Sequence, residues 1–189
     1  MKRRDFIWKG LGAAAFTGAS LSIPFNKLWS SPLPLVPLSP RLPVSPSPLP
    51  YDLVAIKGGE PDIMFDQAIE AMGGMKAFVQ KGQTVVLKPN IGWDVAPERA
   101  GNTNPNLVKR VIQHCLEAGA KEVYVFDNTC DKWDKCYSNS GIEKAVKDAG
   151  GKIAPGNTEN YYQTVEIPGG QKLKTAKVHE LILQSDVFI

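Results

Sequence analysis

Short apolar runs at regular intervals predict the strands of a sheet in the second part of the chain. β-Branched and aromatic residues dominate residues 84–87 and 122–127, and a weaker run covers residues 52–56. Such runs are typical of strands that are buried in a parallel sheet. We expect a further strand at residues 152–154, and residues 185–189 have the pattern with which another buried strand begins.

Apolar residues at helical spacing between these runs predict three helices. Residues 105–118 carry a single apolar stripe, with Asn104 suited to cap the helix and Gly119 suited to end it. A weaker stripe predicts a helix over residues 61–72. A capping-box sequence opens residues 140–150 and predicts the third helix.

The alternation of strands and helices predicts an α/β protein with a mainly parallel, Rossmann-like sheet. Crossovers of this length join parallel strands and are right-handed. Near the C-terminus, the turn sequence of residues 168–170 separates two apolar runs at residues 164–167 and 173–178. This pattern predicts a small antiparallel hairpin beside the parallel sheet.

The first fifty residues do not have the pattern of a folded domain. Nine of the fifteen prolines lie between Pro24 and Pro50. Proline fixes φ and removes a backbone donor, so residues 31–50 are expected to form an extended linker rather than a helix or strand. We therefore expect a disordered N-terminal region of residues 1–50, followed by one domain over residues 51–189.

Residues 1–30 have the pattern of an export signal. Arg3 and Arg4 precede a large apolar residue, and a weakly apolar stretch follows over residues 11–23. This order resembles the signal read by the twin-arginine export machinery, which would be a partner of the chain. The protein would then be periplasmic or otherwise extracytoplasmic, and membrane-tethered if the signal stays uncleaved. An amphipathic helix or a retained anchor is the alternative.

The charge of the chain is concentrated in this N-terminal segment. Five basic residues and one acidic residue give residues 1–30 a net charge of +4, whereas 16 basic and 18 acidic residues from Tyr51 onward give −2. The folded part carries no basic stripe, which argues against nucleic-acid binding. No apolar run reaches about 18 residues, so no stable membrane span is expected.

Two strand ends carry the candidate chemistry. Ligands of open α/β sheets gather at the carboxyl ends of the strands. There Lys88 would neutralise an anionic ligand, and Asp127 would act as a base or coordinate a metal. Free N–H groups at the start of the helix over residues 105–118 would add to the anion site. The other candidate ligand-binding residues are Asn90, Asp94, Asn102, Thr103 and Asn128.

Each of these residues also has a structural interpretation. Lys88 would then pair with a structural acid, Asn104 would serve only as a helix cap, and Asp127 would only end a strand. The sequence contains none of the common nucleotide-binding, serine-hydrolase or zinc-protease motifs, so it assigns no cofactor and no metal.

The spacing of Cys130 and Cys136 fits neither a redox pair nor an iron–sulfur motif. A local disulfide between them in an oxidising compartment and two unlinked thiols are both consistent with the sequence. Cys115 lies on the apolar stripe of its helix and is expected in the core.

Residues 85–94, 102–105, 117–120 and 125–128 together resemble the domain of unknown function 362 family, most closely its exported branch with a twin-arginine signal. The resemblance extends over about residues 51–189 and implies an α/β fold with no assigned reaction. Some members are fused to ferredoxin-like modules, but no such cysteine cluster occurs in this chain. Family domains usually continue past a segment like residues 186–189, which predicts a chain truncated within its domain; a closing terminal strand is the alternative.

Two classes of function follow. The first is an exported enzyme, redox-linked or acting on a small anionic metabolite, that uses Lys88, Asn90 and Asp127. The second is a noncatalytic protein that binds a small ligand or cofactor outside the cytoplasm.

Overall fold

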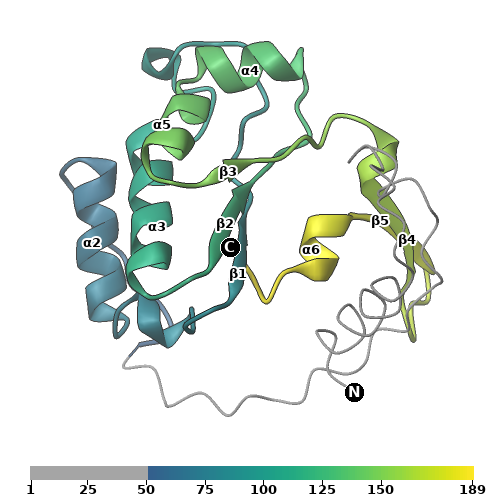
Figure 1. Ribbon diagram of the computed structural model, residues 1–189, viewed down its shortest axis with the longest axis horizontal. Coiled ribbons are helices and arrows are strands. Elements are labelled where there is room, and N and C mark those ends of the chain that lie inside the picture. The colour runs from purple at the N-terminus through teal and green to yellow at the C-terminus, as the bar shows by residue number, and fades with distance from the viewer. Residues whose placement is uncertain (1–50) are drawn as a thin grey trace, which may run out of the picture. The chain divides into compact units, whose positions relative to one another are not determined.

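A four-stranded parallel sheet forms the centre of the fold (Figure 1). The computed structural model describes residues 51–189, so the signal and linker predicted for residues 1–50 lie outside the described residues. The strand order is β3-β2-β1-β6, and all neighbours are parallel. The strands are β1 (Thr84–Leu87), β2 (Glu122–Val125), β3 (Lys152–Ile153) and β6 (Val187–Phe188). The predicted α/β class with a parallel sheet is confirmed.

Three helices cover one face of this sheet (Figure 1). They are α2 (Pro61–Ala71), α3 (Pro105–Glu117) and α5 (Ile142–Asp148), and each corresponds to a predicted helix. The apolar stripe of α3 is buried against the strands, where burial of apolar side chains provides most of the stabilisation. The core on this face includes Val85, Val123, Val108, Ile112 and Cys115, each at most 1% exposed.

The predicted cap of α3 is present. The Asn104 side chain accepts hydrogen bonds from the N–H groups of Asn106 and Leu107, at 2.8 and 3.4 Å. The capping box predicted for α5 is only half formed. The Ser140 hydroxyl accepts from the N–H of Ile142 at 3.3 Å, but Glu143 pairs with Lys147 in place of returning to the start of the helix.

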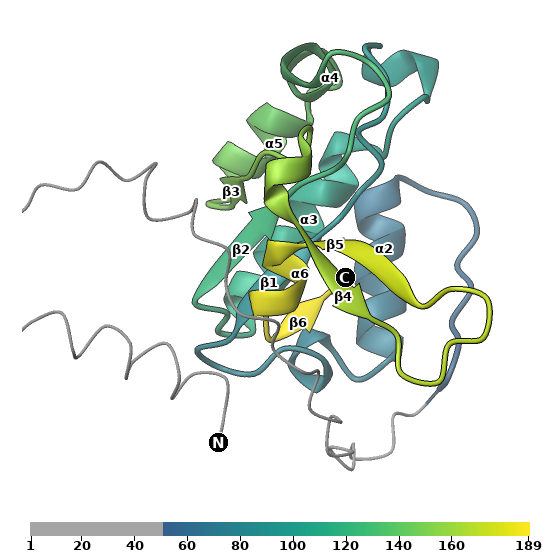
Figure 2. The ribbon, with the colours of Figure 1, turned by 90° about the vertical axis from the view of Figure 1, so that its right-hand side faces the viewer.

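A smaller apolar cluster lies on the other face of the sheet. Figure 2 shows α6 (Glu180–Gln184) and the hairpin of β4 (Tyr162–Glu166) and β5 (Thr175–His179) on this side. The hairpin is antiparallel, as the turn sequence predicts. Val86, Phe126 and Leu181 form the centre of the cluster, so this face has far fewer buried side chains than the face covered by α3.

Two sequence predictions about strands are wrong in the structure. Residues 52–56 form no strand, because no neighbouring strand pairs with them and Leu53 is 83% exposed. The last strand exists as β6, but Phe188 is 48% exposed and not buried. Among the described residues β6 pairs only with β1 and forms an edge of the sheet.

Several short elements have no counterpart in the sequence predictions. These are the helix α4 (Trp133–Asn139), the helix α6, and the 3-10 turns η2 (Met75–Ala77), η3 (Pro97–Arg99) and η4 (Glu159–Tyr161). Each is seven residues or shorter, which is too short for an apolar stripe to identify it.

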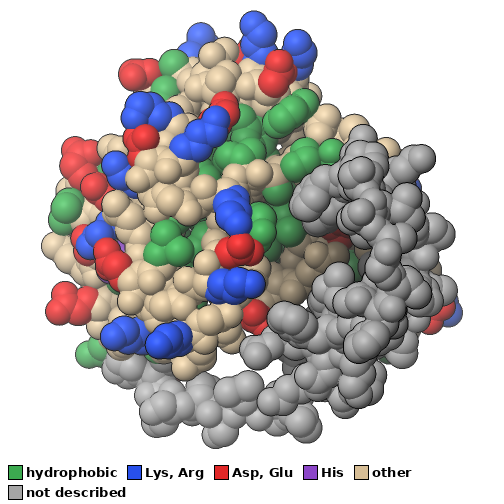
Figure 3. Space-filling model, in the orientation of Figure 1, with side chains coloured by type: hydrophobic (Ala, Val, Ile, Leu, Met, Phe, Trp, Pro, Cys, Tyr) green, Lys and Arg blue, Asp and Glu red, His purple; other side chains and the backbone are tan. Residues whose placement is uncertain are grey.

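Charged side chains of both signs are interspersed over the surface shown in Figure 3, with hydrophobic side chains exposed near its centre. On the described part of this face, neither sign of charge forms a continuous patch. None of the helices within residues 51–189 is long and apolar enough to cross a membrane.

The larger cluster should dominate the stability of the domain. Ile112 is fully buried on α3, so Ile112→Ala is expected to lower the free energy of unfolding by about 2–5 kcal/mol. The matched control is Ile63→Ala on α2, which removes the same atoms from a side chain that is 51% exposed and should cost less than about 1 kcal/mol. Urea unfolding followed by circular dichroism measures both, and equal losses would contradict this assignment of the core.

Candidate functional site at the carboxyl ends of the parallel strands

The order in which successive strands are added to the sheet changes sides at β1. The strands β1, β2 and β3 follow one another to one side, whereas β6 pairs with the opposite edge of β1. In open α/β sheets such a switch point leaves a crevice for ligands at the carboxyl ends of the strands. Lys88 directly follows β1, and its N–H donates to the carbonyl of Ile189 after β6, at 2.9 Å. The structure thus places Lys88 at the switch point.

Lys88 and Asp127 form an ion pair across the ends of β1 and β2. The Lys88 Nζ lies 2.5 Å from Asp127 Oδ1, and the N–H of Ile91 donates to Asp127 Oδ2 at 2.7 Å. Asp127 is 5% exposed, whereas 41% of the Lys88 side chain is exposed. Each carboxylate oxygen thus has a partner within the protein, while the Lys88 side chain remains partly exposed.

This geometry changes the role expected for Asp127. A base or a metal ligand needs an oxygen that can reach a proton or a metal, whereas Asp127 is 5% exposed and each of its oxygens has a partner within the protein. The structural alternative, in which Lys88 pairs with a buried acid, describes the observed arrangement. In this arrangement Asp127 orients the Lys88 ammonium.

Tyr137, on α4, holds the backbone of Asp127. Its hydroxyl accepts from the Asp127 N–H at 2.6 Å and donates to the Asp127 carbonyl at 3.3 Å. The Tyr137 side chain is 1% exposed, and burial raises the pKa of its phenol. The sequence prediction missed this residue, because α4 carries no clear helical pattern.

Asn90 braces the loop that follows β1. Its Oδ1 accepts from the N–H of Gly92 at 3.0 Å, and its Nδ2 donates to the carbonyl of Gly101 at 3.2 Å. The backbone N–H of Asn90 donates to the Thr103 hydroxyl at 3.0 Å, and the Thr103 N–H donates to the Asn90 carbonyl. The predicted ligand-binding atoms of Asn90 are thus used within the protein.

Asn102 and Asp94 have similar structural roles. The Asn102 side chain accepts from the N–H of Trp93 and donates to the Trp93 carbonyl, at 3.0 and 2.9 Å. Asp94 Oδ1 accepts from Asn139 of α4 at 2.6 Å, and its N–H donates to Asp131 at 3.1 Å. These side chains hold the loop in place, so they are poor candidates for direct ligand contact.

The backbone N–H groups at the start of α3 also have a partner within the protein. The Asn104 side chain already accepts from two of the N–H groups that were expected to bind an anion. Because those donors have a partner within the protein, the helix start does not extend the anion site as the sequence suggested.

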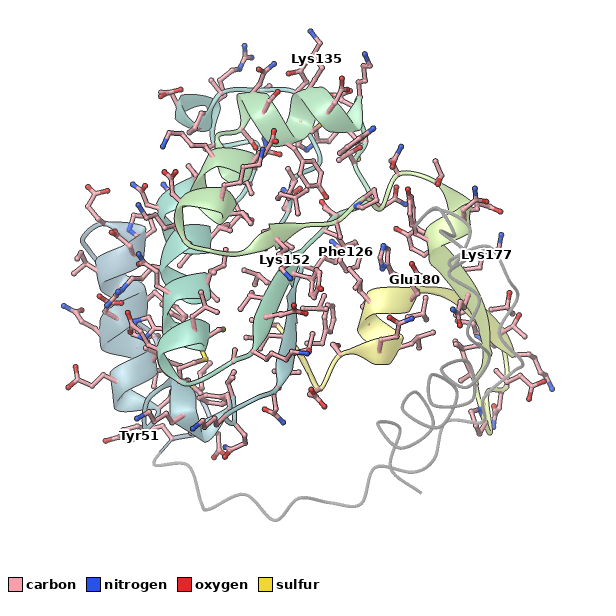
Figure 4. The ribbon with its side chains drawn as sticks, viewed as in Figure 1. Tyr51, Phe126, Lys135, Lys152, Lys177 and Glu180 are labelled. Atoms are coloured by element: carbon pink, nitrogen blue, oxygen red, sulfur yellow. The ribbon has the colours of Figure 1, made fainter. Side chains whose placement is uncertain are left out.

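Asn128, a predicted ligand-binding residue, lines a pocket. It follows Asp127, is exposed, and has no hydrogen-bond partner within the described part of the chain. The pocket has a volume of about 290 Å³, and its other walls come from Gly156, Asn157, Thr158, Glu159, Tyr162 and Lys177. Figure 4 shows Lys177 on the hairpin side of this region. No sequence pattern marked these residues, because they come from an irregular segment and from both strands of the hairpin.

His179 is a structural residue. Its Nδ1 accepts from the N–H of Leu181 at 3.1 Å and caps α6, and its Nε2 donates to the Pro155 carbonyl at 2.9 Å. Phe126 stacks on the ring at 3.9 Å between centroids, and Figure 4 shows Phe126 directed toward α6. Burial lowers the pKa of the imidazole, which favours its neutral form.

A second polar cluster ties α2 to α3. Asp66 Oδ1 accepts from Arg110 Nε and from His114 Nε2, at 2.6 and 2.7 Å, beside a surface hollow of about 630 Å³. The Arg110 hydrogen bond lowers the pKa of Asp66.

Within residues 51–189 no group of three or more His, Cys, Asp or Glu side chains could hold a metal ion.

Three free thiols are present, and no disulfide joins Cys130 to Cys136. The Gly92 carbonyl accepts from the Cys130 N–H at 2.9 Å and from the Cys136 thiol at 3.6 Å. Cys130 is exposed, whereas Cys136 and Cys115 are buried. Burial raises the pKa of Cys136, and raises that of Cys115 to about 11. The structure thus has the second of the two arrangements that the sequence allowed, with unlinked thiols.

A thiol count distinguishes these arrangements. In native protein purified without reductant, we expect a maleimide reagent at neutral pH to modify only Cys130, because the other two thiols are buried and their pKa values are raised. All three should react in denaturant, and mass spectrometry of peptides assigns the sites. A single reactive thiol in denaturant, with none in the native protein, would instead reveal a disulfide.

Comparisons of the sequence with known proteins relate this chain to a protein family and to a cyanobacterial protein. A thylakoid-associated protein of Synechocystis sp., sll1697, is 43% identical over 53 residues, which make up 28% of this chain and only 16% of that protein. No solved structure matches the chain. The family model described as a domain of unknown function, DUF362, matches residues 85–189, from within β1 to the last residue. The match covers more than half of the chain and includes Lys88 and Asp127, and the chain therefore belongs to the DUF362 family.

Proposed function

We propose that this domain binds a small anionic metabolite at the carboxyl ends of β1 and β2, with Lys88 contacting the anion. One observation carries the proposal. The Lys88 ammonium is held by a buried carboxylate at the switch point of the sheet, and its side chain keeps 41% of its surface exposed. An oriented ammonium loses little freedom when an anion binds, and this preorganisation favours binding.

Asp127, the partner of Lys88, also determines how strongly and over what range the site attracts an anion. Because Asp127 offsets the positive charge, long-range attraction of anions is weak, and Lys88 acts chiefly as an oriented donor at short range. Asn128, the residue after Asp127, is exposed and lines a pocket. Such a site suits a small metabolite with one anionic group better than a polyanion.

The same arrangement serves an enzyme or a binding protein. A fixed ammonium can stabilise negative charge that develops on an oxygen in a transition state. One observation favours the noncatalytic alternative: the Asp127 carboxylate is 5% exposed and paired with Lys88, so a substrate has little access to it as the base of a proton-transfer reaction. We place anion binding first, and regard catalysis, redox-linked or not, as a function built on that binding.

Removing the ion pair tests this proposal. Lys88→Ala alone would leave the Asp127 carboxylate buried without its partner, which is costly. The double variant Lys88→Met with Asp127→Asn removes both charges and keeps an acceptor for the Ile91 N–H. We expect it to weaken the binding of hexanoate, a simple carboxylate probe, at least about tenfold, as for loss of a charge-assisted hydrogen bond.

The control removes a similar ion pair elsewhere. Lys152, on β3, pairs with Glu122, the first residue of β2, at 2.6 Å. Lys152→Met with Glu122→Gln should leave hexanoate affinity unchanged. Titration calorimetry at low salt measures both variants, and equal affinity of the Lys88 double variant and the unaltered protein would refute the proposed site.

We also infer that residues 1–30 direct export through the twin-arginine machinery, to the periplasm or another extracytoplasmic space. The paired Arg3 and Arg4 and the weakly apolar stretch after them support this. The Synechocystis relative is named for an association with thylakoids, which are membranes, and export through a membrane is consistent with that name.

Changing Arg3 and Arg4 together to Lys should block export of a reporter protein fused behind residues 1–50, because the receptor reads the arginine pair. Cell fractionation measures the exported share. The control is Lys27→Arg, which keeps the charge and leaves the pair intact. Undiminished export of the Lys-Lys variant would exclude this pathway.

A further inference from the structure

The pocket beside Asn128 adjoins the backbone of Asp127, the residue that pairs with Lys88. A Cβ atom on Gly156 would lie 2.7 Å from the Asp127 carbonyl, so the pocket wall packs directly on the residue that positions Lys88. The Tyr162 hydroxyl donates to the Gly156 carbonyl at 2.9 Å. Burial raises the pKa of Tyr162, and the Asp127 carboxylate adds to this, so the phenol lies within the electrostatic reach of the ion pair.

The chemistry of the walls is polar and electrically neutral. Asn128, Asn157 and Thr158 present amide and hydroxyl groups. The only charges among the residues that line the pocket, Lys177 and Glu159, pair with each other at 2.6 Å. Because Glu159 and Lys177 offset each other, the pocket offers no net positive charge to a second anionic group, and no Leu, Ile, Val or Met lines it. These walls match neutral groups that donate and accept hydrogen bonds, such as hydroxyls.

The size of the pocket limits what it can hold. Its volume of about 290 Å³ lies at the lower end of the range of about 300–1,000 Å³ that is usual for ligand sites. The pocket therefore suits a body about as large as one monosaccharide, and it is too small for a dinucleotide or a long chain.

From this position, chemistry and size, we propose that the pocket holds the hydroxyl-bearing body of the anion that Lys88 binds. The ligand is then a small polyhydroxylated carboxylate, in the chemical class of the sugar acids. This inference rests on the proposed function, since Lys88 provides the contact to the carboxylate. Asn128, between Asp127 and the pocket, would bind the hydroxyl groups nearest the carboxylate.

Two probes separate the inference from the proposed function. Gluconate and hexanoate are both six-carbon monocarboxylates, and they differ in the hydroxyl groups along the chain. We expect the unaltered full-length protein to bind gluconate at least about tenfold more tightly than hexanoate, measured by calorimetry or by ligand-observed NMR. The double variant Lys88→Met with Asp127→Asn should weaken the binding of both probes.

Variants in the pocket should affect only the hydroxylated probe. Asn128→Ala removes an exposed amide, and we expect it to weaken gluconate binding about three- to tenfold while leaving hexanoate unchanged. Thr158→Val, which exchanges a hydroxyl for a methyl group of similar shape, should have the same selective effect. Asn160→Ala is the matched control, because Asn160 is exposed nearby in the chain but does not line the pocket.

Each outcome supports or overturns one of the two proposals. If both probes bind equally and depend on Lys88, the inference about the pocket is overturned and the proposed function stands. A preference for gluconate that survives both Asn128→Ala and Thr158→Val also overturns the inference. Binding that is absent, or that does not depend on the Lys88–Asp127 pair, overturns the proposed function together with the inference.

Discussion

The buried carboxylate of Asp127 holds together the segments that form the candidate site. It receives the Lys88 ammonium from the end of β1 and the N–H of Ile91 from the loop beyond, while Tyr137 of α4 holds its backbone. A carboxylate that is 5% exposed must keep such partners, because an unpaired charge at this depth is very costly. The requirement to satisfy one buried charge therefore fixes the geometry of Lys88 and of the loop after β1, and Tyr137 ties α4 to the same residue through its backbone.

This constraint separates the polar residues at the strand ends into two groups. Asn90 and Asn102 use their side chains within the loop, and they keep it rigid beneath the position of the proposed ligand. Lys88 and Asn128 remain accessible, and Asn128 opens onto the pocket next to the hairpin. In the proposed site, most polar side chains are thus hydrogen-bonded within the protein, and a small number of donors and acceptors remain accessible. Side chains that hold the loop in place and others that remain accessible are expected where binding requires a preorganised donor.

Local sequence signals predicted much of the fold. The strand at residues 84–87, the helix α3 with its Asn104 cap and the antiparallel hairpin all follow from patterns that act over a few residues. The predictions failed where an element depends on a distant partner. Residues 52–56 have the pattern of a strand but lack a neighbour, and Phe188 lies in a strand at the edge of the sheet. In the site, Lys88, Asp127 and Asn128 were correctly placed at strand ends, whereas Tyr137 and the far wall of the pocket carried no local signal.

The sequence by itself determined the class of fold, the order of its main elements and the strand ends at which polar side chains gather, because apolar periodicity, caps and turns are local properties. Only the tertiary structure decided which polar groups are free. An asparagine is equally able to brace a loop or bind a ligand, and the choice depends on which donors and acceptors the folded chain brings within about 3 Å of it. The contacts of Asp127 have the same origin: the ends of β1 and β2 lie side by side, and its two oxygens meet the Lys88 ammonium and the Ile91 N–H.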